Sequence, residues 1–264
     1  MSEQQQNPPV DLVIVIDTSV SLKDDAAAAS QAAEAALEAA RAKCPADLRV
    51  VWLGIEGTWK ETLFERTLRH YLTAECGVAA AALRGRQRGE LKGGGAQEDG
   101  ARAIEDIAKH FDWRPQAKRA VFFLGDEALE GGGDQVDAEN IEAADRAIQT
   151  ARAAAVSVHT YFGKSRSRHK QALQQEYARL ARETGGQAFT AENVSAGFAT
   201  VLEDSICASR AQAIAVEATA GQTGAETCTL LTTGLADYGY WWQRIHQEQP
   251  AKAAHDFRRG RIWA

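Results

Sequence analysis

The sequence predicts an α/β protein with a doubly wound, mostly parallel central sheet flanked by helices, in a Rossmann-like arrangement with a C-terminal appendage. Short apolar runs rich in branched residues alternate along the chain with longer stretches of helical periodicity, as in folds built from strand–helix–strand units. In addition, acidic residues directly follow two of the apolar runs. Ligand sites of such sheets form at the carboxyl ends of the strands.

The chain starts with a polar segment, residues 1–9, which we expect to be flexible. The run Val10–Ile16 is almost continuously apolar, as expected for a strand covered on both faces of a parallel sheet. The Ala- and Glu-rich stretch Asp24–Lys43 has high helix propensity and is stopped by Pro45. A strand, a short loop and a helix are therefore predicted in this order.

Further elements of the same two kinds follow. Additional strands are predicted at Leu48–Ile55, Lys118–Leu124 and Val156–Phe162. Three intervening stretches carry apolar residues on one helical face: Ile104, Ile107, Ala108 and Phe111; Ile141, Ala144 and Ile148; and Leu173, Tyr177, Leu180 and Ala181. His159, inside the last strand, is expected to be a satisfied core residue rather than a ligand.

Two regions depart from this alternation. Between Gly57 and Gly95 we expect an insertion or hairpin, with an extended piece at Thr58–Leu68 and an Ala-rich piece at Gly77–Leu83. After residue 208 Gly and Thr accumulate, and aromatic residues cluster at Tyr238–Trp242. The main domain is therefore expected at 10–207, with 208–264 as an extension that packs on it or forms a partner surface.

Composition limits the function and the compartment. The net charge of -6 argues against a nucleic-acid partner, because phosphate backbones are bound by clustered Lys and Arg. No basic start with an apolar segment and no run of membrane-spanning length is present, so neither a secretion signal nor a membrane anchor is predicted. The four cysteines form no CxxC pair and are expected to be reduced thiols: Cys44, Cys76, Cys207 and Cys228. Cytoplasmic residence follows as the expectation.

The motif that carries chemistry is Asp17-Thr18-Ser19-Val20-Ser21, between the first strand and the first helix. One carboxylate and two hydroxyls at positions i, i+2 and i+4 of a loop can converge on one hard divalent cation, which prefers oxygen ligands. The alternative is structural, because Ser21 could cap the helix that follows.

This motif resembles the D-x-S-x-S signature of the metal-ion-dependent adhesion site of von Willebrand factor A domains, called I domains in integrins. The resemblance covers roughly Val10 to Ser205, most of the chain. It implies that Asp17, Ser19 and Ser21 bind a divalent cation, Mg²⁺ with Mn²⁺ or Ca²⁺ as alternatives. In such sites the cation takes a further carboxylate from a protein partner.

The family completes the site from two more loops. Gly93–Gly100 resembles the loop of integrin β-type and related intracellular A domains, in which a Glu two residues before a Gly takes the role that Thr plays elsewhere; Glu98 matches it. Asp99 is the alternate ligand, and for both acids the structural alternative is a position at the positive end of the next helix. Asp126, directly after the apolar strand, matches the acid of the third loop.

The resemblance implies a divalent-metal-dependent protein-interaction module, a cytoplasmic scaffold or adaptor, and not an enzyme. The partner would offer an Asp or Glu, and by analogy with similar domains it could be an AAA+ ATPase or another complex subunit. No phosphate-binding G-x-x-x-x-G-K-[ST] loop, G-x-S-x-G or H-E-x-x-H motif occurs. Two alternatives remain, a metal-dependent phosphoester hydrolase and a metal-free structural protein that binds through its aromatic tail.

Overall fold

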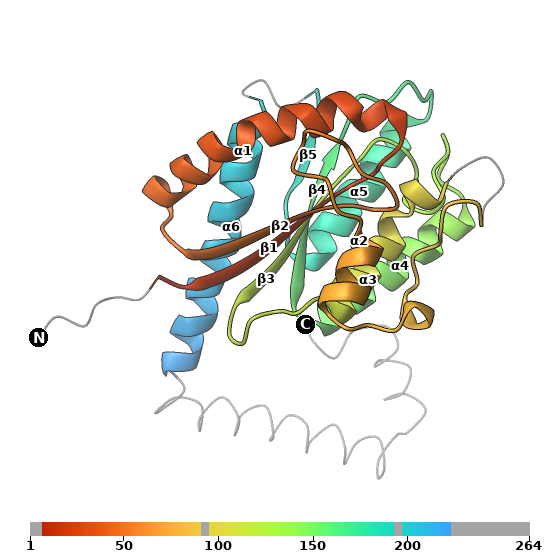
Figure 1. Cartoon of the computed structure of the whole chain (residues 1–264). Helices are drawn as coiled ribbons and strands as arrows, with labels where there is room; N and C mark the ends of the chain where they lie inside the picture. Colours follow the sequence, from red (N-terminus) through yellow and green to blue (C-terminus); the bar gives the residue numbers. More distant parts are fainter. Residues whose placement is uncertain (1–6, 91–94, 193–196, 223–264) are drawn as a thin grey trace, which may run out of the picture. The chain divides into compact units, whose positions relative to one another are not determined.

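Five parallel strands form the centre of the protein, in the order β2-β1-β3-β4-β5 (Figure 1). This computed structural model describes residues 7–90, 95–192 and 197–222. The chain divides into two units, Met1–Ile214 and Ala215–Ala264, and the sheet belongs to the first. The strands are β1 Pro9–Ile16, β2 Asp47–Gly54, β3 Lys118–Gly125, β4 Val156–Phe162 and β5 Ala188–Thr190.

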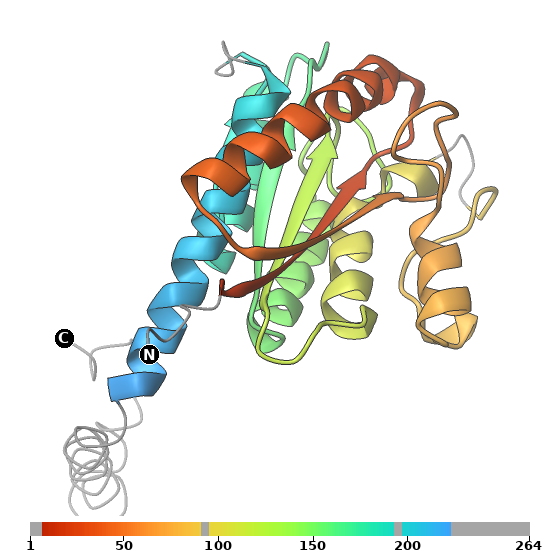
Figure 2. The same cartoon turned by 60° about the vertical axis from the view of Figure 1, so that its left-hand side comes forward.

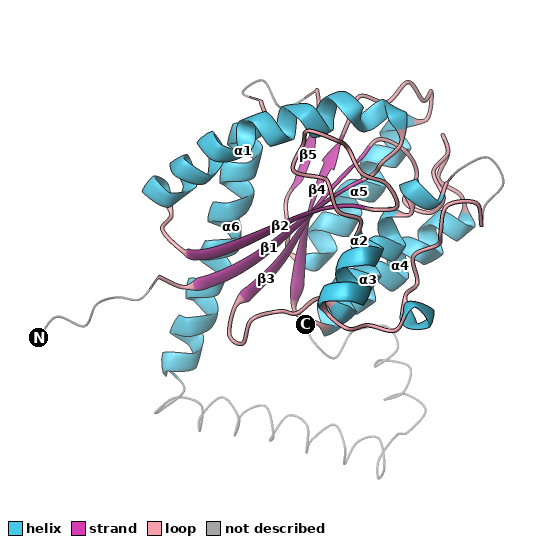
Figure 3. Cartoon of the chain, in the orientation of Figure 1, coloured by secondary structure: helices cyan, strands magenta, loops and turns pink. Residues whose placement is uncertain are grey.

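Helices cover both faces of the sheet (Figures 2 and 3). They are α1 Lys23–Lys43, α2 Leu68–His70, α3 Gly100–His110, α4 Ala138–Ala153, α5 Lys170–Thr184 and α6 Phe198–Gln222. Alternate residues of a strand point to opposite faces. Thus Leu12 and Ile14 of β1 pack with α1 and α6, whereas Val13 and Val15 pack with α3, α4 and α5. The predicted doubly wound α/β fold is confirmed.

Two regions differ from the expectation. β5, only three residues long and partly exposed, was not predicted, because so short a segment has no readable periodicity. The stretch Thr58–Leu68, expected to be extended, consists of turns before α2, with one isolated bridge between Gly54 and Thr67. In Gly77–Leu83 the regular structure is a single 3-10 turn, Ala80–Ala82. The insertion therefore contains no hairpin in its described part, residues 57–90.

The C-terminal boundary that we expected at residue 207 falls inside α6, Phe198–Gln222, which runs through it without a break. The aromatic cluster Tyr238–Trp242 and the first six residues lie outside the described residues. None of the helices in the described ranges combines the length and the apolarity that crossing a bilayer requires.

The cysteines require a correction. Cys44, at the end of α1, forms a disulfide with Cys207 on α6, with 5.4 Å between the two Cα atoms. The expectation of reduced thiols was wrong for this pair, because the two residues are 163 positions apart in the sequence and meet only when α6 packs beside α1. Cys76 is free, and Cys228 lies outside the described residues. The cytoplasmic expectation thereby loses the support of the cysteines, since disulfides persist mainly in oxidising compartments.

His159 on β4 is a core residue, as predicted. Its side chain is fully buried. The Nδ1 atom accepts a hydrogen bond from the Gln187 N–H at 3.2 Å, and Nε2 lies 3.2 Å from the Ser209 hydroxyl of α6. Burial, together with the charge of Lys118, lowers the pKa of His159 to about 4. The ring is therefore neutral at pH 7 and joins α6 to the sheet.

Candidate metal site

Asp17 lies at the carboxyl edge of the sheet, where β1 ends. Its backbone N–H donates to the carbonyl oxygen of Leu124 on β3 at 2.9 Å, which holds the loop after β1 against the neighbouring strand. The Asp17 side chain is turned inward, with 2% of the residue exposed. Its Oδ1 accepts a hydrogen bond from the Ser19 N–H at 2.6 Å. The first carboxylate is thus buried and oriented by its own loop.

The two serine hydroxyls connect Asp17's loop to Asp126. Ser19 Oγ lies 2.9 Å from Ser21 Oγ, and Ser21 Oγ donates to Asp126 Oδ1 at 3.1 Å. The capping alternative does not describe this arrangement, because Leu22 occupies the N-cap position of α1 and no side chain caps it. The hydroxyls therefore face the acid of another loop rather than the end of a helix.

Glu98 reaches the same edge from the loop before α3. Its loop is joined to the first one by a hydrogen bond from the Thr18 N–H to the Gln97 carbonyl oxygen, at 3.2 Å. The Glu98 carboxylate lies over Gly132, where a Cβ atom would come within 2.0 Å of Glu98 Oε2 and 2.8 Å of Glu127 Oε2. Gly132 also has a φ of +73°. Two acids therefore crowd a position that only a glycine can occupy.

Asp99, the alternate ligand, is placed differently. The Arg86 guanidinium forms two hydrogen bonds with its carboxylate, and the Gly131 N–H donates to the same group at 2.7 Å. Asp99 is fully buried and makes no side-chain cap on α3. Its charge is balanced by a cation, so the structure does not bring it into the cluster formed by the other predicted residues.

We call the side chains of Asp17, Ser19, Ser21, Glu98 and Asp126 the acidic pit. Within the described ranges, no Lys, Arg or His lies within 4 Å of its three carboxylates. The pKa values reflect this arrangement. Burial raises the pKa of Asp17 well above its usual value, and the charges of Glu98 and Asp126 add to the rise while the Ser19 N–H opposes it.

The other two carboxylates of the pit behave in the same way. Burial and the charges of Glu127 and Asp126 raise the pKa of Glu98 to about 7. Burial also raises the pKa of Asp126 to about 6; its hydrogen bond from Ser21 opposes this rise, and the charges of Glu127 and Asp25 reinforce it. Each carboxylate therefore holds its proton more tightly than in water.

From the sequence, Glu127 is expected to point away from the ligands because it is the direct neighbour of Asp126, and Asp25 was not predicted to lie near the pit. Asp25 lies in the first turn of α1, where an acid is ordinarily explained by the helix dipole. A Cβ atom on Gly163 would lie 3.3 Å from Asp126 Cβ and 3.8 Å from Asp25 Oδ2. The start of β4's following loop therefore lies against both acids, which only the folded sheet brings together.

The donors of the pit suit a hard cation, although they are not a ready-made carboxylate cage. In the part of the chain that the structure describes, no group of three or more His, Cys, Asp or Glu side chains is arranged to hold a metal ion. The hydroxyls lie between Asp17 and Asp126, whereas Glu98 is turned toward Glu127. Two carboxylates and two hydroxyls remain, and all of them are oxygen donors of the kind that Mg²⁺ and Ca²⁺ prefer.

Comparisons with known proteins add little to the geometry. No family model and no curated protein matches the chain. Among solved structures, three of proximal thread matrix protein 1 from the mussel byssus are similar, with TM-scores of 0.41, 0.40 and 0.39 and 13%, 12% and 13% identity. One is described with a zinc-occupied MIDAS motif. Each match covers 76% of this chain and 48% or 49% of that protein, so the chain spans about half of its length.

Proposed function

We propose that this chain is a von Willebrand A-type interaction module that binds a divalent cation in the acidic pit and, through the cation, a carboxylate of a protein partner. Mg²⁺ is the proposed ion, with Mn²⁺ or Ca²⁺ as alternatives. The observation that carries the proposal is the series from Ser19 through Ser21 to Asp126, beside a buried Asp17. It joins oxygen donors of two loops in one place.

Electrostatics support a cation at this position. Carboxylates that are buried near one another without a counter-charge destabilise a fold, so natural proteins pair them or use them to hold metal ions. A divalent cation would offset the repulsion among Asp17, Glu98 and Asp126. The Ser19 and Ser21 hydroxyls are neutral, so they would add oxygen ligands without adding negative charge that repels a carboxylate from outside.

The proposed role is not enzymatic. The pit consists of carboxylates and hydroxyls, and the hydroxyl of the buried Tyr177 donates to the Glu127 carbonyl oxygen at 3.0 Å. Hydrolysis through a covalent intermediate would need a serine activated by a neighbouring base. Within the described residues, no hydrogen bond joins Ser19 or Ser21 to a histidine.

The partner and the compartment belong to the same proposal. The Cys44–Cys207 disulfide favours an oxidising compartment over the cytoplasm, where thiols are kept reduced. A cytoplasmic AAA+ ATPase, suggested earlier by resemblance, fits such a compartment poorly. We therefore propose a protein partner defined by its chemistry, a surface Asp or Glu, and a binding domain that begins at residue 10 and includes the first part of α6, up to Ile214.

Calorimetric titration tests the metal claim. Mg²⁺, Mn²⁺ and Ca²⁺ would each be titrated into the wild type, into Asp17→Ala and into Asp24→Ala. Asp24 is an exposed acid at the start of α1, so its variant has the same change in charge a few residues from the pit. We expect saturable heats from the wild type and Asp24→Ala and none from Asp17→Ala. Equal heats from all three proteins would refute metal binding at the pit.

A further inference from the structure

A run of cations lies beside the acidic pit, on the loop that joins β4 to α5. Lys164, Arg166 and Arg168 are exposed, whereas Ser165 and Ser167 between them are half-buried. We call Lys164–Arg168 the basic arm. Exposed and half-buried positions thus alternate up to Arg168, where a turn leads into α5, and the three positive charges lie on the solvent side of the arm.

Hydrogen bonds hold this arm in place. At its start, the Gly163 N–H donates to the Gly125 carbonyl oxygen at 2.8 Å, next to Asp126. Near its end, Ser167 Oγ donates to the Asp134 carbonyl oxygen at 2.8 Å and accepts from the His169 N–H at 2.9 Å. The Gly163 N–H thus attaches the arm to the end of β3, the Ser167 hydroxyl attaches it to the loop at Asp134, and its cations are left outside.

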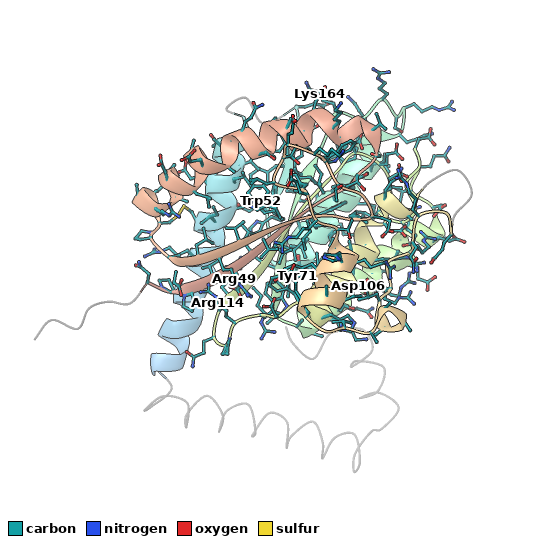
Figure 4. The ribbon with its side chains drawn as sticks, viewed as in Figure 1. Arg49, Trp52, Tyr71, Asp106, Arg114 and Lys164 are labelled. Atoms are coloured by element: carbon teal, nitrogen blue, oxygen red, sulfur yellow. A yellow bond between two sulfur atoms is a disulfide. The ribbon has the colours of Figure 1, made fainter. Side chains whose placement is uncertain are left out.

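The three cations have no acid to neutralise them. In the described part of the chain, no carboxylate lies within 4 Å of Lys164, Arg166 or Arg168, whereas the next cation, Lys170, pairs with Glu192 at 2.6 Å. The charge of Lys164 does act on Asp25, whose pKa it lowers against the effect of burial. Figure 4 shows Lys164 at the outside of the molecule, far from Arg49 and Arg114 at the other end of the strands.

The loop that carries Asp17, Ser19 and Ser21 adds an apolar contact point. Val20, between Ser19 and Ser21, is 82% exposed. Among the described residues, the other exposed large apolar side chains, Leu63 and Ile141, are 42% and 44% exposed. A partner that reaches the pit would therefore find an exposed apolar side chain within the loop of the pit's serines.

We propose that the basic arm binds an acidic polypeptide segment whose carboxylates lie at alternate positions, next to the residue that contacts the cation. This inference rests on the proposed function, because it describes the partner of the same edge. Alternate residues of an extended peptide lie about 6.6 Å apart on one side, so its carboxylates would face the exposed cations, which also occupy alternate positions. A continuous phosphate backbone fits less well, because the chain has a net charge of -6 and nucleic-acid binding relies on many clustered Lys and Arg side chains, whereas the arm offers three cations.

The test is a titration by fluorescence anisotropy at low salt. The probe is a labelled eight-residue peptide of alternating Glu and Ser, and its control replaces Glu by Gln. The arm variant is Lys164→Gln with Arg166→Gln and Arg168→Gln. The matched variant, Arg41→Gln with Lys109→Gln and Arg152→Gln, removes three exposed cations from helix ends at the opposite edge of the sheet.

We expect the arm variant to bind the Glu–Ser peptide about tenfold more weakly than the wild type, since each exposed ion pair contributes modestly. The matched variant should bind like the wild type, and the Gln–Ser peptide should not bind. Circular dichroism melts would show that all three proteins are folded. Equal affinities of the wild type and the arm variant would overturn the inference, as would binding of a DNA octanucleotide but not of the Glu–Ser peptide.

The same titration, repeated with EDTA and with Asp17→Ala, separates the inference from the function on which it rests. If the peptide binds without metal and binds Asp17→Ala equally well, but loses affinity for the arm variant, the arm is supported and the cation does not mediate the contact with the partner, which refutes that part of the proposed function. If binding requires Mg²⁺ and Asp17 but is the same for the arm variant, the metal claim is supported and the arm is refuted.

Discussion

The two edges of the sheet surround their buried carboxylates with different side chains. At the amino edge, Asp11 is 0% exposed and is held by two arginines: Arg49 donates to it at 2.8 Å and Arg114 at 2.7 Å. Figure 4 places these two arginines at the same end of the strands. At the carboxyl edge, Asp17 is buried almost as completely, yet its described neighbours are acids and hydroxyls.

The pKa values follow this difference. Burial alone would raise the pKa of Asp11, but hydrogen bonds from Arg49 and Arg114 outweigh it and lower the pKa. Burial raises the pKa of Asp17, and nearby acids raise it further. The amino edge also holds the Cys44–Cys207 disulfide, just before β2. One edge is therefore built to stabilise the fold, whereas the other retains uncompensated charge, which is typical of a binding site.

The largest effect is expected from the disulfide. Because the Cys44–Cys207 bond links positions 163 residues apart, chain-entropy reasoning gives it about 5 kcal/mol of stabilisation. Cys44→Ser with Cys207→Ser should lower the free energy of unfolding in urea toward that extent. Cys76→Ser, at the free thiol, serves as the control. The double variant should keep its Mg²⁺ affinity within about twofold, since the pit is at the other edge. An unchanged urea midpoint would contradict the predicted stabilisation by the disulfide.

The next largest effect is expected at Asp11. Asp11→Ala should lower the free energy of unfolding by about 3 kcal/mol, because it leaves two partly buried arginines without their shared partner. Asp47→Ala, which removes a carboxylate with 62% exposure from Arg114, should cost less than about 1 kcal/mol.

The Asp11 effect should also depend on pH. A lowered pKa means that the native state favours the charged form, so its stabilisation is present above pH 3.8 and is lost as the pH falls through the native-state pKa. The difference in stability between the wild type and Asp11→Ala should therefore shrink in strong acid. A difference that stays constant between pH 7 and pH 2 would show that the Arg49 and Arg114 contacts are not its origin.

The sequence predicted much of the fold because the sheet is buried on both faces. β1 and β4 are short apolar runs, and their bounds agree with the prediction to within one residue. β5 was not predicted because it has only three residues. No ion pair was predicted for Asp11 inside its apolar run, because its partners, Arg49 and Arg114, come from β2 and from the loop before β3. Side-chain pairing across strands is not visible in a single sequence.

For the pit, the sequence predicted which loops meet at the carboxyl edge but not which way each side chain points. Strand ends place Asp17 and Asp126 at one edge, and the fold brings Ser21 to within 3.1 Å of Asp126. That Asp99 turns to Arg86 depends on where the insertion lies, and the insertion has no periodicity to predict it. The disulfide was not predicted either, because it depends on how α6 packs against α1.

The smallest expected effect tests whether removing a carboxylate charge changes the free energy of unfolding in opposite directions at the two edges. With EDTA present, Asp126→Asn should raise the free energy of unfolding by about 1 kcal/mol, because it removes one charge from an uncompensated cluster and leaves an amide oxygen to accept from Ser21. Asp11→Asn, the same substitution at the other edge, should lower it. Saturating Mg²⁺ should reverse the order at Asp126, since a ligand at 100 times its Kd stabilises the wild type by about 2.7 kcal/mol. If Asp126→Asn destabilises the metal-free protein as much as Asp11→Asn does, the carboxyl edge holds no excess charge, and the two edges do not differ in the way proposed.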